Sequence, residues 1–209
     1  MTGRRFVVAL TGASGAAYGR RLLECLARSG HAVHLLVSPA AAMVARQELG
    51  IELDLADGAG VVRALLGEEP PEVRYHAVGD LEAPVASGSF RHDGMAVCPC
   101  SAGSLGRIAG GISSNLIERA ADVCLKERRR LVLVPRETPL SEIHLENMLR
   151  LTRAGAVILP ASPGFYGPAA KVGDLVDFVV SRVLDHLGVE NDLVPRYAPP
   201  SRRRHPEER

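Results

Sequence analysis

The sequence predicts a single α/β domain, a three-layer sandwich in which helices cover both faces of a parallel sheet. Short apolar runs alternate along the chain with longer segments whose apolar residues recur at helical spacing, as in strand–helix–strand units. Two of these runs end in loops of glycine and serine that lead directly into a helix. The expected strands are residues 6–10, 32–37, 73–78, 95–98, 131–134 and 156–159.

Length and composition agree with one soluble globular domain. The chain has 209 residues, 46% of them hydrophobic, and a formal net charge of +1. Such a balanced charge gives no indication of binding to nucleic acid or to a membrane. No apolar run approaches the roughly 20 residues that span a bilayer, and residues 1–5 lead into the first strand without the apolar core of a signal peptide. We therefore expect a cytoplasmic protein.

The cysteines are expected to be reduced thiols of the core. They lie in apolar surroundings and lack the spacing of a zinc site, and no metal site is predicted. Two of them flank a proline beside the binding loop described below, so a nucleophilic role is the alternative for that pair. The four are Cys25, Cys98, Cys100 and Cys124.

The first loop, residues 11–15 (TGASG), follows strand 6–10 and opens a helix that begins near Ala16 and closes at Gly30. The strand 32–37 comes next and ends at Ser38. A dinucleotide-binding fold normally has Asp or Glu at that point to hold a ribose hydroxyl, and the first loop also lacks the G-x-G-x-x-G spacing. The pattern therefore favours a mononucleotide over NAD.

The segment between Ser38 and the centre of the chain carries little chemistry. Residues 39–49 are predicted to be a helix with Met43 on its apolar side, and residues 61–66 a second, short helix. His76 is expected to be a solvated side chain at a strand edge. The small-residue loop 87–89 (SGS) either borders a ligand or lies on the surface.

The central stretch, residues 95–123, is predicted to deliver a second loop to the same place. Pro99 ends the strand 95–98, and the residues that follow are too small and polar for packing to be their purpose. Glycine permits close approach of the main chain, while serine hydroxyls and N–H groups at a helix start bind anions. An ordinary strand-to-helix turn is an equal alternative for this loop alone, but the first loop favours a shared crevice at the carboxyl ends of adjacent strands. The loop residues are Ser101, Ala102, Gly103 and Ser104.

Charged residues after the central loop extend the predicted site. A helix is expected over residues 116–126, with Arg119 and Lys126 about two turns apart. The strand 131–134 then leads to Arg136 and Glu137, and we expect Thr138 and Pro139 to start a helix there that runs to residue 154. Arginine binds phosphate in a bidentate fashion, and a glutamate beside phosphate is suited to proton transfer.

The C-terminal part supplies aromatic residues and the last helix. The loop after strand 156–159 holds Phe165 and Tyr166 in a frame of proline and glycine, which suits a wall for an apolar ligand or a flavin ring. A helix over 174–187 presents a broad apolar face, with Arg182 among its residues, for the sheet and for another subunit. Residues 1–188 are expected to form the domain, and 189–209 a C-terminal arm that is partly disordered.

Five motifs together resemble those of the flavin prenyltransferases, the UbiX family, over roughly residues 5–188. They occur in the family's order: GASG at 12–15, PCS at 99–101, NLIERAADV at 115–123, PRETPL at 135–140 and GFY at 164–166. The resemblance implies a flavodoxin-like fold that binds reduced FMN. It also implies transfer of a dimethylallyl group from dimethylallyl monophosphate to N5 and C6 of the flavin, without a metal. The prenylated FMN then serves a partner decarboxylase of the UbiD type.

The resemblance also implies roles for individual residues. FMN contacts fall on Gly12, Ala13, Ser14, Ser38, Ser101, Ala102, Gly103, Ser104 and Arg136. It implies that Tyr166 and Arg182 bind the substrate phosphate. Lys126 and Arg119 of a neighbouring subunit are expected to contribute to the same site in a homo-oligomer, by resemblance a dodecamer. Glu137 is expected to protonate the departing phosphate, and Ser14 to relay protons near N5. The family's aromatic residue near the C-terminus is not evident, because the chain has no tryptophan.

Two other functions remain as alternatives. An FMN-dependent cysteine decarboxylase of the same fold carries Pro-Ala-Ser-Ala-Asn-Thr where residues 99–104 read PCSAGS, so the missing asparagine weighs against it. A non-catalytic flavin-binding protein leaves Arg136, Glu137 and Tyr166 without a role.

Overall fold

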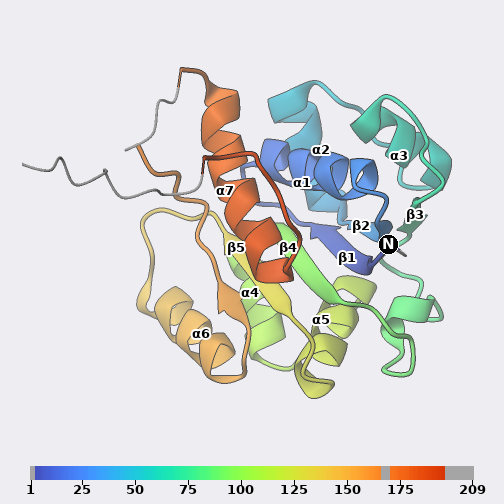
Figure 1. Cartoon of the computed structure of the whole chain (residues 1–209). Helices are drawn as coiled ribbons and strands as arrows, with labels where there is room; N and C mark the ends of the chain where they lie inside the picture. The colour runs from blue at the N-terminus through green and yellow to red at the C-terminus, as the bar shows by residue number, and fades with distance from the viewer. Residues whose placement is uncertain (1–2, 166–169, 196–209) are drawn as a thin grey trace, which may run out of the picture.

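The computed structural model describes residues 3–165 and 170–195. Six strands form one sheet in the order β3-β2-β1-β4-β5-β6, and every neighbouring pair is parallel. This confirms the predicted parallel α/β architecture, which is flavodoxin-like (Figure 1). The strands are β1 (Arg5–Leu10), β2 (Ala32–Val37), β3 (Val73–His76), β4 (Gly94–Cys100), β5 (Leu131–Pro135) and β6 (Val157–Ile158).

Helices cover both faces of the sheet, as Figure 1 shows. One face packs against α1 (Ala16–Arg28), α2 (Pro39–Leu49), α3 (Gly58–Leu66) and α7 (Val172–Leu187). The other face packs against α4 (Ala102–Ala109), α5 (Leu116–Lys126) and α6 (Glu142–Arg153), and a short 3-10 turn, η1 (Pro84–Ala86), lies beside α5. Within residues 3–165 and 170–195, no helix is both long and apolar enough to cross a membrane.

The two central strands are apolar on both faces because helices cover both. Along β1, Phe6, Val8 and Leu10 join the core on the α1 side, while Val7 and Ala9 join the core on the α5 side. The whole of β4 is buried as well. Buried parallel strands read as nearly continuous apolar runs, which is why the pattern located them.

The start of α6 differs from the prediction. The helix begins at Glu142, because Ser141 caps it and not Thr138, and Pro139 follows a cis peptide bond in the connecting segment. Ser141 and His144 form a reciprocal capping box, in which each side chain accepts the other residue's backbone N–H at 3.3 Å. This cap outweighs the competing Thr-Pro signal.

Three smaller expectations also need correction. The strand β4 continues through Pro99 to Cys100, past the proline that was expected to end it. His76 is buried, with its Nε2 2.8 Å from Nδ1 of His34, so it is not a solvated edge residue. In α2 the buried residues are Ala41 and Ala45, while Met43 is exposed, because the small side chains let α2 lie close to its neighbours.

The segment after α7 folds back onto the domain. Val189 is buried, and Leu193 packs against the core on the α1 side of the sheet. The predicted arm begins at residue 189, and its residues 196–209 lie outside the part of the chain that the structure describes. The boundary at residue 188 stays a prediction.

Candidate functional site

Thr11 joins the two glycine- and serine-containing loops at the carboxyl ends of β1 and β4. Its hydroxyl donates to the carbonyl of Pro99 at 2.9 Å and accepts the backbone N–H of Ser101 at 2.7 Å. Its backbone N–H also donates to Pro99 O, and the side chain is buried. The sheet order changes direction between β1 and β4, where open α/β sheets bind ligands.

A crevice of about 330 Å³ opens beside these loops. It gathers predicted cofactor-binding residues from three strand ends: Gly12 after β1, Ser38 after β2, and Ser101 and Ser104 after β4. Three helices start at its wall. Their first turns are capped by side chains that accept a backbone N–H: Ser38 for α2, Ser101 for α4 and Asn115 for α5.

Gly12 is needed because the first loop runs against α2. A Cβ built on Gly12 would lie 2.5 Å from the Cβ of Ala40, a distance that neither side chain can relieve by rotating. Ala13 belongs to the first loop and is buried, while Ala102 is the first residue of α4 and is half-buried. The backbone can therefore approach a ligand closely at Gly12 and at the exposed Gly103.

A second polar group lies at the start of α1, and its central residue, Glu48, was missed in the sequence. The carboxylate of Glu48 accepts the backbone N–H groups of Gly15, at 2.9 Å, and Ala16, at 2.8 Å, and it bonds the side chain of Ser14. Burial alone would raise the pKa of Glu48, but these hydrogen bonds and the nearby charge of Arg136 outweigh it and lower the pKa. In the sequence Glu48 is one residue of the helix predicted over 39–49, and no local signal marks it.

Arg136 lies beside this group at the end of β5, as expected. Its charge acts on Glu48, and its Nε is buried without a hydrogen-bond partner among the described residues. A buried unpaired donor is costly, so an oxygen atom of a bound ligand would satisfy it. Glu137 follows on the exposed connecting segment, where its carboxylate accepts the N–H of Thr138 at 3.2 Å.

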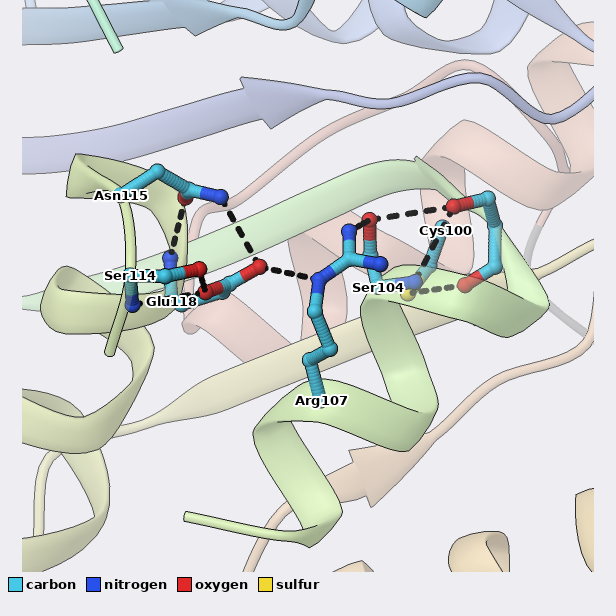
Figure 2. Close-up of polar contacts among 7 residues, drawn as sticks. Cys100, Ser104, Arg107, Ser114, Asn115 and Glu118 are labelled. Carbon is cyan, nitrogen blue, oxygen red and sulfur yellow. Dashed lines mark hydrogen bonds and ion pairs between the residues drawn. The ribbon is translucent and has the colours of Figure 1, made fainter. Parts of the chain in front are cut away.

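A further network lines the crevice on its α4 and α5 side (Figure 2). Arg107 donates through Nε to the carboxylate of Glu118 and through Nη2 to Ser104 Oγ at 3.4 Å. Glu118 is 1% exposed and also accepts hydrogen bonds from Ser114 and Asn115. Neither residue of this ion pair was singled out in the sequence, because the two come from different helices.

The paired thiols beside Pro99 are unsuited to nucleophilic chemistry. Both are fully buried, and burial raises the pKa of the Cys98 thiol strongly and that of Cys100 to about 12. The thiolate is the reactive form, so both groups stay protonated near neutral pH. All four cysteines are free, as the sequence predicts.

Comparison with known proteins assigns this site to a family. A family model described as Flavoprotein matches residues 1–184. A flavin prenyltransferase UbiX from Pseudomonas aeruginosa is 51% identical over 92% of this chain and 93% of its own. The chain belongs to the UbiX family of flavin prenyltransferases.

Solved structures of UbiX-type proteins share the fold. A UbiX protein crystallised with FMN and dimethylallyl pyrophosphate has a TM-score of 0.84 and 47% identity, over 94% of this chain and 98% of its own. A dodecameric FMN-dependent UbiX-like decarboxylase from Escherichia coli O157:H7 has a TM-score of 0.81 and 43% identity, over 93% and 98% of the two chains. An FMN-dependent cysteine decarboxylase from thioviridamide biosynthesis is 18% identical, a likeness that shows the fold alone.

Of the four residues that the UbiX resemblance assigns to the substrate phosphate, the three that the structure describes do not line the crevice. Arg119 donates to Ala86 O and to Asp122, each at 3.0 Å, and Lys126 donates to Glu127 at 2.6 Å, at the far end of α5. Arg182 is exposed on α7 and forms an ion pair with Asp185 at 2.9 Å. Tyr166 lies outside the described residues. The contribution of Arg119 and Lys126 from a neighbouring subunit stays a prediction.

Proposed function

We propose that this chain transfers a dimethylallyl group from dimethylallyl monophosphate to reduced FMN, giving prenylated FMN. The observation that carries the proposal is the juxtaposition of the crevice with the Ser14, Glu48 and Arg136 group. The crevice offers backbone and hydroxyl contacts to one flavin. In the adjacent group Arg136, whose buried Nε has no hydrogen-bond partner among the described residues, offers a cation to a second, anionic reactant. Family membership over the whole domain supports the same activity.

The proposed reaction forms two bonds to the flavin. The carbon–oxygen bond to phosphate breaks as the allyl carbon bonds to N5, which loses its proton. The double bond of the transferred group then takes up a proton at one carbon while its other carbon bonds to C6, and C6 loses its hydrogen as a proton. Glu137 protonates the departing phosphate, Ser14 passes protons near N5, and the released phosphate serves as the later base. Arg136 balances negative charge beside Glu48 throughout.

The substrate phosphate is proposed to lie where Tyr166 and Arg182 of one subunit meet Arg119 and Lys126 of another. The dodecameric relative supports a homo-oligomer of this kind. The recipient of prenylated FMN is proposed to be a UbiD-type decarboxylase, and the setting to be the cytoplasm. We also expect prenyl transfer to proceed unchanged in the presence of a metal chelator.

One incubation tests the proposed function. Purified protein, reduced FMN and dimethylallyl monophosphate are combined without oxygen, and the released flavin is analysed by mass spectrometry. A flavin heavier by one dimethylallyl group is the expected product. Unmodified FMN, together with decarboxylation of a cysteine-terminated peptide supplied in a parallel incubation, would instead identify a cysteine decarboxylase. Exposed Gly103 stands where those enzymes carry asparagine.

A further inference from the structure

Arg107 is held in the wall of the crevice by two contacts that leave part of its guanidinium unused. Nε donates to Glu118, and Nη2 donates to Ser104 at 3.4 Å. Nη1 has no partner among the residues that the structure describes, and it lies beside Gly103, since a Cβ there would be 3.4 Å from it. The free donor therefore lies beside the first turn of α4, within the segment 101–104 that is predicted to bind the cofactor.

Glu118 is itself held in place by hydrogen bonds and positions this arginine. Its side chain is 1% exposed and accepts from Ser114 N at 2.9 Å, Ser114 Oγ at 2.6 Å and Asn115 Nδ2 at 2.8 Å. Burial by itself would raise the pKa of Glu118, but the hydrogen bonds from Ser114 and Arg107 outweigh it and keep the carboxylate charged. Burying a carboxylate costs free energy, and here the ion pair fixes one orientation of an otherwise flexible side chain.

The two anion-binding parts of the site are not equivalent. At the start of α1, the N–H groups of Gly15 and Ala16 already bond the carboxylate of Glu48. In the crevice, the hydroxyl of Ser38 accepts a hydrogen bond from Ala41 and keeps its own proton for a ligand. An anion would therefore meet hydroxyl donors and a guanidinium in the crevice, whereas at the start of α1 it would meet a carboxylate.

We propose that Arg107, held by Glu118, binds the phosphate group of FMN and thereby distinguishes FMN from riboflavin. This inference rests on the proposed function, in which FMN occupies the crevice. Arginine presents planar donors that match phosphate oxygens, and the Nη1 group beside Gly103 is free to make that contact. Glu118 acts as a positioning residue that presents the guanidinium.

The test compares two flavins that differ only in the phosphate. Oxidised FMN and oxidised riboflavin are titrated with wild-type protein and with Arg107→Met, and binding is followed by flavin fluorescence. We expect Arg107→Met to raise the Kd for FMN about 10- to 100-fold, the range for loss of a hydrogen bond to a charged group. The Kd for riboflavin should change by less than about twofold, because general damage to the crevice would affect both flavins equally.

Two further variants separate charge from folding. Arg107→Lys keeps the cation but loses the planar fork, so its Kd for FMN should lie between those of wild type and Arg107→Met. Arg63→Met is the matched control, because Arg63 forms an exposed ion pair with Glu69 at 3.0 Å and does not line the crevice. It should bind both flavins as wild type does. If Arg107→Met does not fold, the inference is tested by Arg107→Lys and by the ratio of the wild-type Kd values for riboflavin and FMN.

The inference is overturned if Arg107→Met or Arg107→Lys weakens FMN and riboflavin by the same factor, or leaves the Kd for FMN unchanged. Equal binding of the two flavins by wild-type protein overturns it as well. Those outcomes leave the proposed function standing, because the protein still binds FMN. A wild-type protein that binds neither flavin contradicts the proposed function itself.

Discussion

The hydroxyl of Thr11 and the backbone nitrogen of Ser101 lie 2.7 Å apart, which fixes the β1 loop against the β4 loop. The same hydroxyl donates to Pro99 O at 2.9 Å, so one side chain satisfies two backbone groups of the other loop. Residues 90 positions apart in the chain thus set the width of the crevice together. The spacing of the two loops should be sensitive to this single hydroxyl.

Thr11→Val tests that linkage, because valine keeps the shape but leaves the Ser101 N–H without its partner and Pro99 O with only the backbone N–H of Thr11. We expect the free energy of unfolding to fall by about 1–3 kcal/mol and FMN binding to weaken. Urea denaturation and a flavin titration provide the measurements. Thr11→Ser, which retains the hydroxyl, is the control and should stay near wild type. Wild-type stability in Thr11→Val would show that the loops are held by other contacts.

Gly12→Ala tests the close approach of the first loop to α2. The added Cβ would meet the Cβ of Ala40 at 2.5 Å, so the loop or the helix has to move. Overpacking of this kind costs about 1–3 kcal/mol, and we expect FMN affinity to fall with stability. Gly79→Ala is the control, since nothing lies within 4 Å of its Cβ, and it should change stability by less than about 0.5 kcal/mol. Equal effects of the two variants would contradict the prediction.

Glu137→Gln tests proton transfer to the leaving phosphate. Glutamine keeps the size and hydrogen-bonding reach of glutamate but does not exchange a proton. The variant should therefore bind FMN normally and lose about 10²- to 10⁴-fold in the rate of prenyl transfer. Turnover is measured with reduced FMN and saturating dimethylallyl monophosphate. Wild-type turnover would assign the proton to another group, with Glu48, bonded to Ser14, as the next residue to substitute.

Stability should fall in acid because of two histidines in contact, His34, which is half-buried, and His76, which is buried. Burial, together with the nearby charge of His76, lowers the pKa of His34 to about 4 from an ordinary value of 6.5. The unfolded chain therefore binds this proton more tightly than the folded chain does. The contribution of neutral His34 to the free energy of unfolding is complete above about pH 6.5 and is lost as the pH falls toward about 4. The pKa of His76 is lowered too, mainly by burial, which acts in the same direction.

Thermal melting from about pH 8 to about pH 5 checks this sign. Wild-type protein should lose Tm over that range, and His34→Gln should have a lower Tm at high pH but a flatter dependence. His186→Gln replaces an exposed histidine on α7 and should keep the wild-type slope. A slope unchanged in His34→Gln would mean that other groups control the acid sensitivity.

The last prediction concerns assembly, and the structure changes which surface is expected to carry it. The sequence favoured the last helix, for the sheet and for another subunit, together with the basic segment after Leu125. Val179, Val180 and Val183 of α7 are buried within the chain, as expected for packing on the sheet. On α6 three apolar side chains are exposed, Ile143 (68%), Leu145 (52%) and Leu149 (49%), whereas on α7 the exposed large apolar residue is Val172 at its first position. We expect a homo-oligomer by light scattering, and we expect Ile143→Glu to reduce its mass. A mass of one 22.3 kDa chain for the wild type at micromolar concentration would contradict this.

Local patterns in the sequence predicted the features that depend on neighbouring residues. The apolar runs located the strands, and Ser38, Ser101 and Asn115 each preceded a helix that they cap. Arg136 was placed correctly at a strand end, because the apolar run 131–134 located β5 and Arg136 directly follows its last residue. Its neighbour Glu137 was placed at a strand end directly before a helix start at Thr138, but two capping signals competed within a few residues and Ser141 caps the helix.

Features that depend on distant residues could not be predicted. Glu48 reaches the start of α1 from the end of α2, and Arg107 meets Glu118 between two helices. Each is an ordinary charged residue within its own helix. The packing of α2 on α1 brings Glu48 to the start of α1, and the packing of α4 beside α5 brings Arg107 and Glu118 together in the crevice wall.

The central position of β1 also bears on how the protein is made. β1 pairs with β2, which follows closely, but its other edge pairs with β4, and Phe6 lies opposite Gly94. While the ribosome is still completing the first hundred or so residues, that edge of β1 has no partner and exposes its hydrogen-bonding groups. The nascent chain therefore assembles the crevice only once β4 has emerged, and shielding by a chaperone in that interval should raise the yield of folded protein.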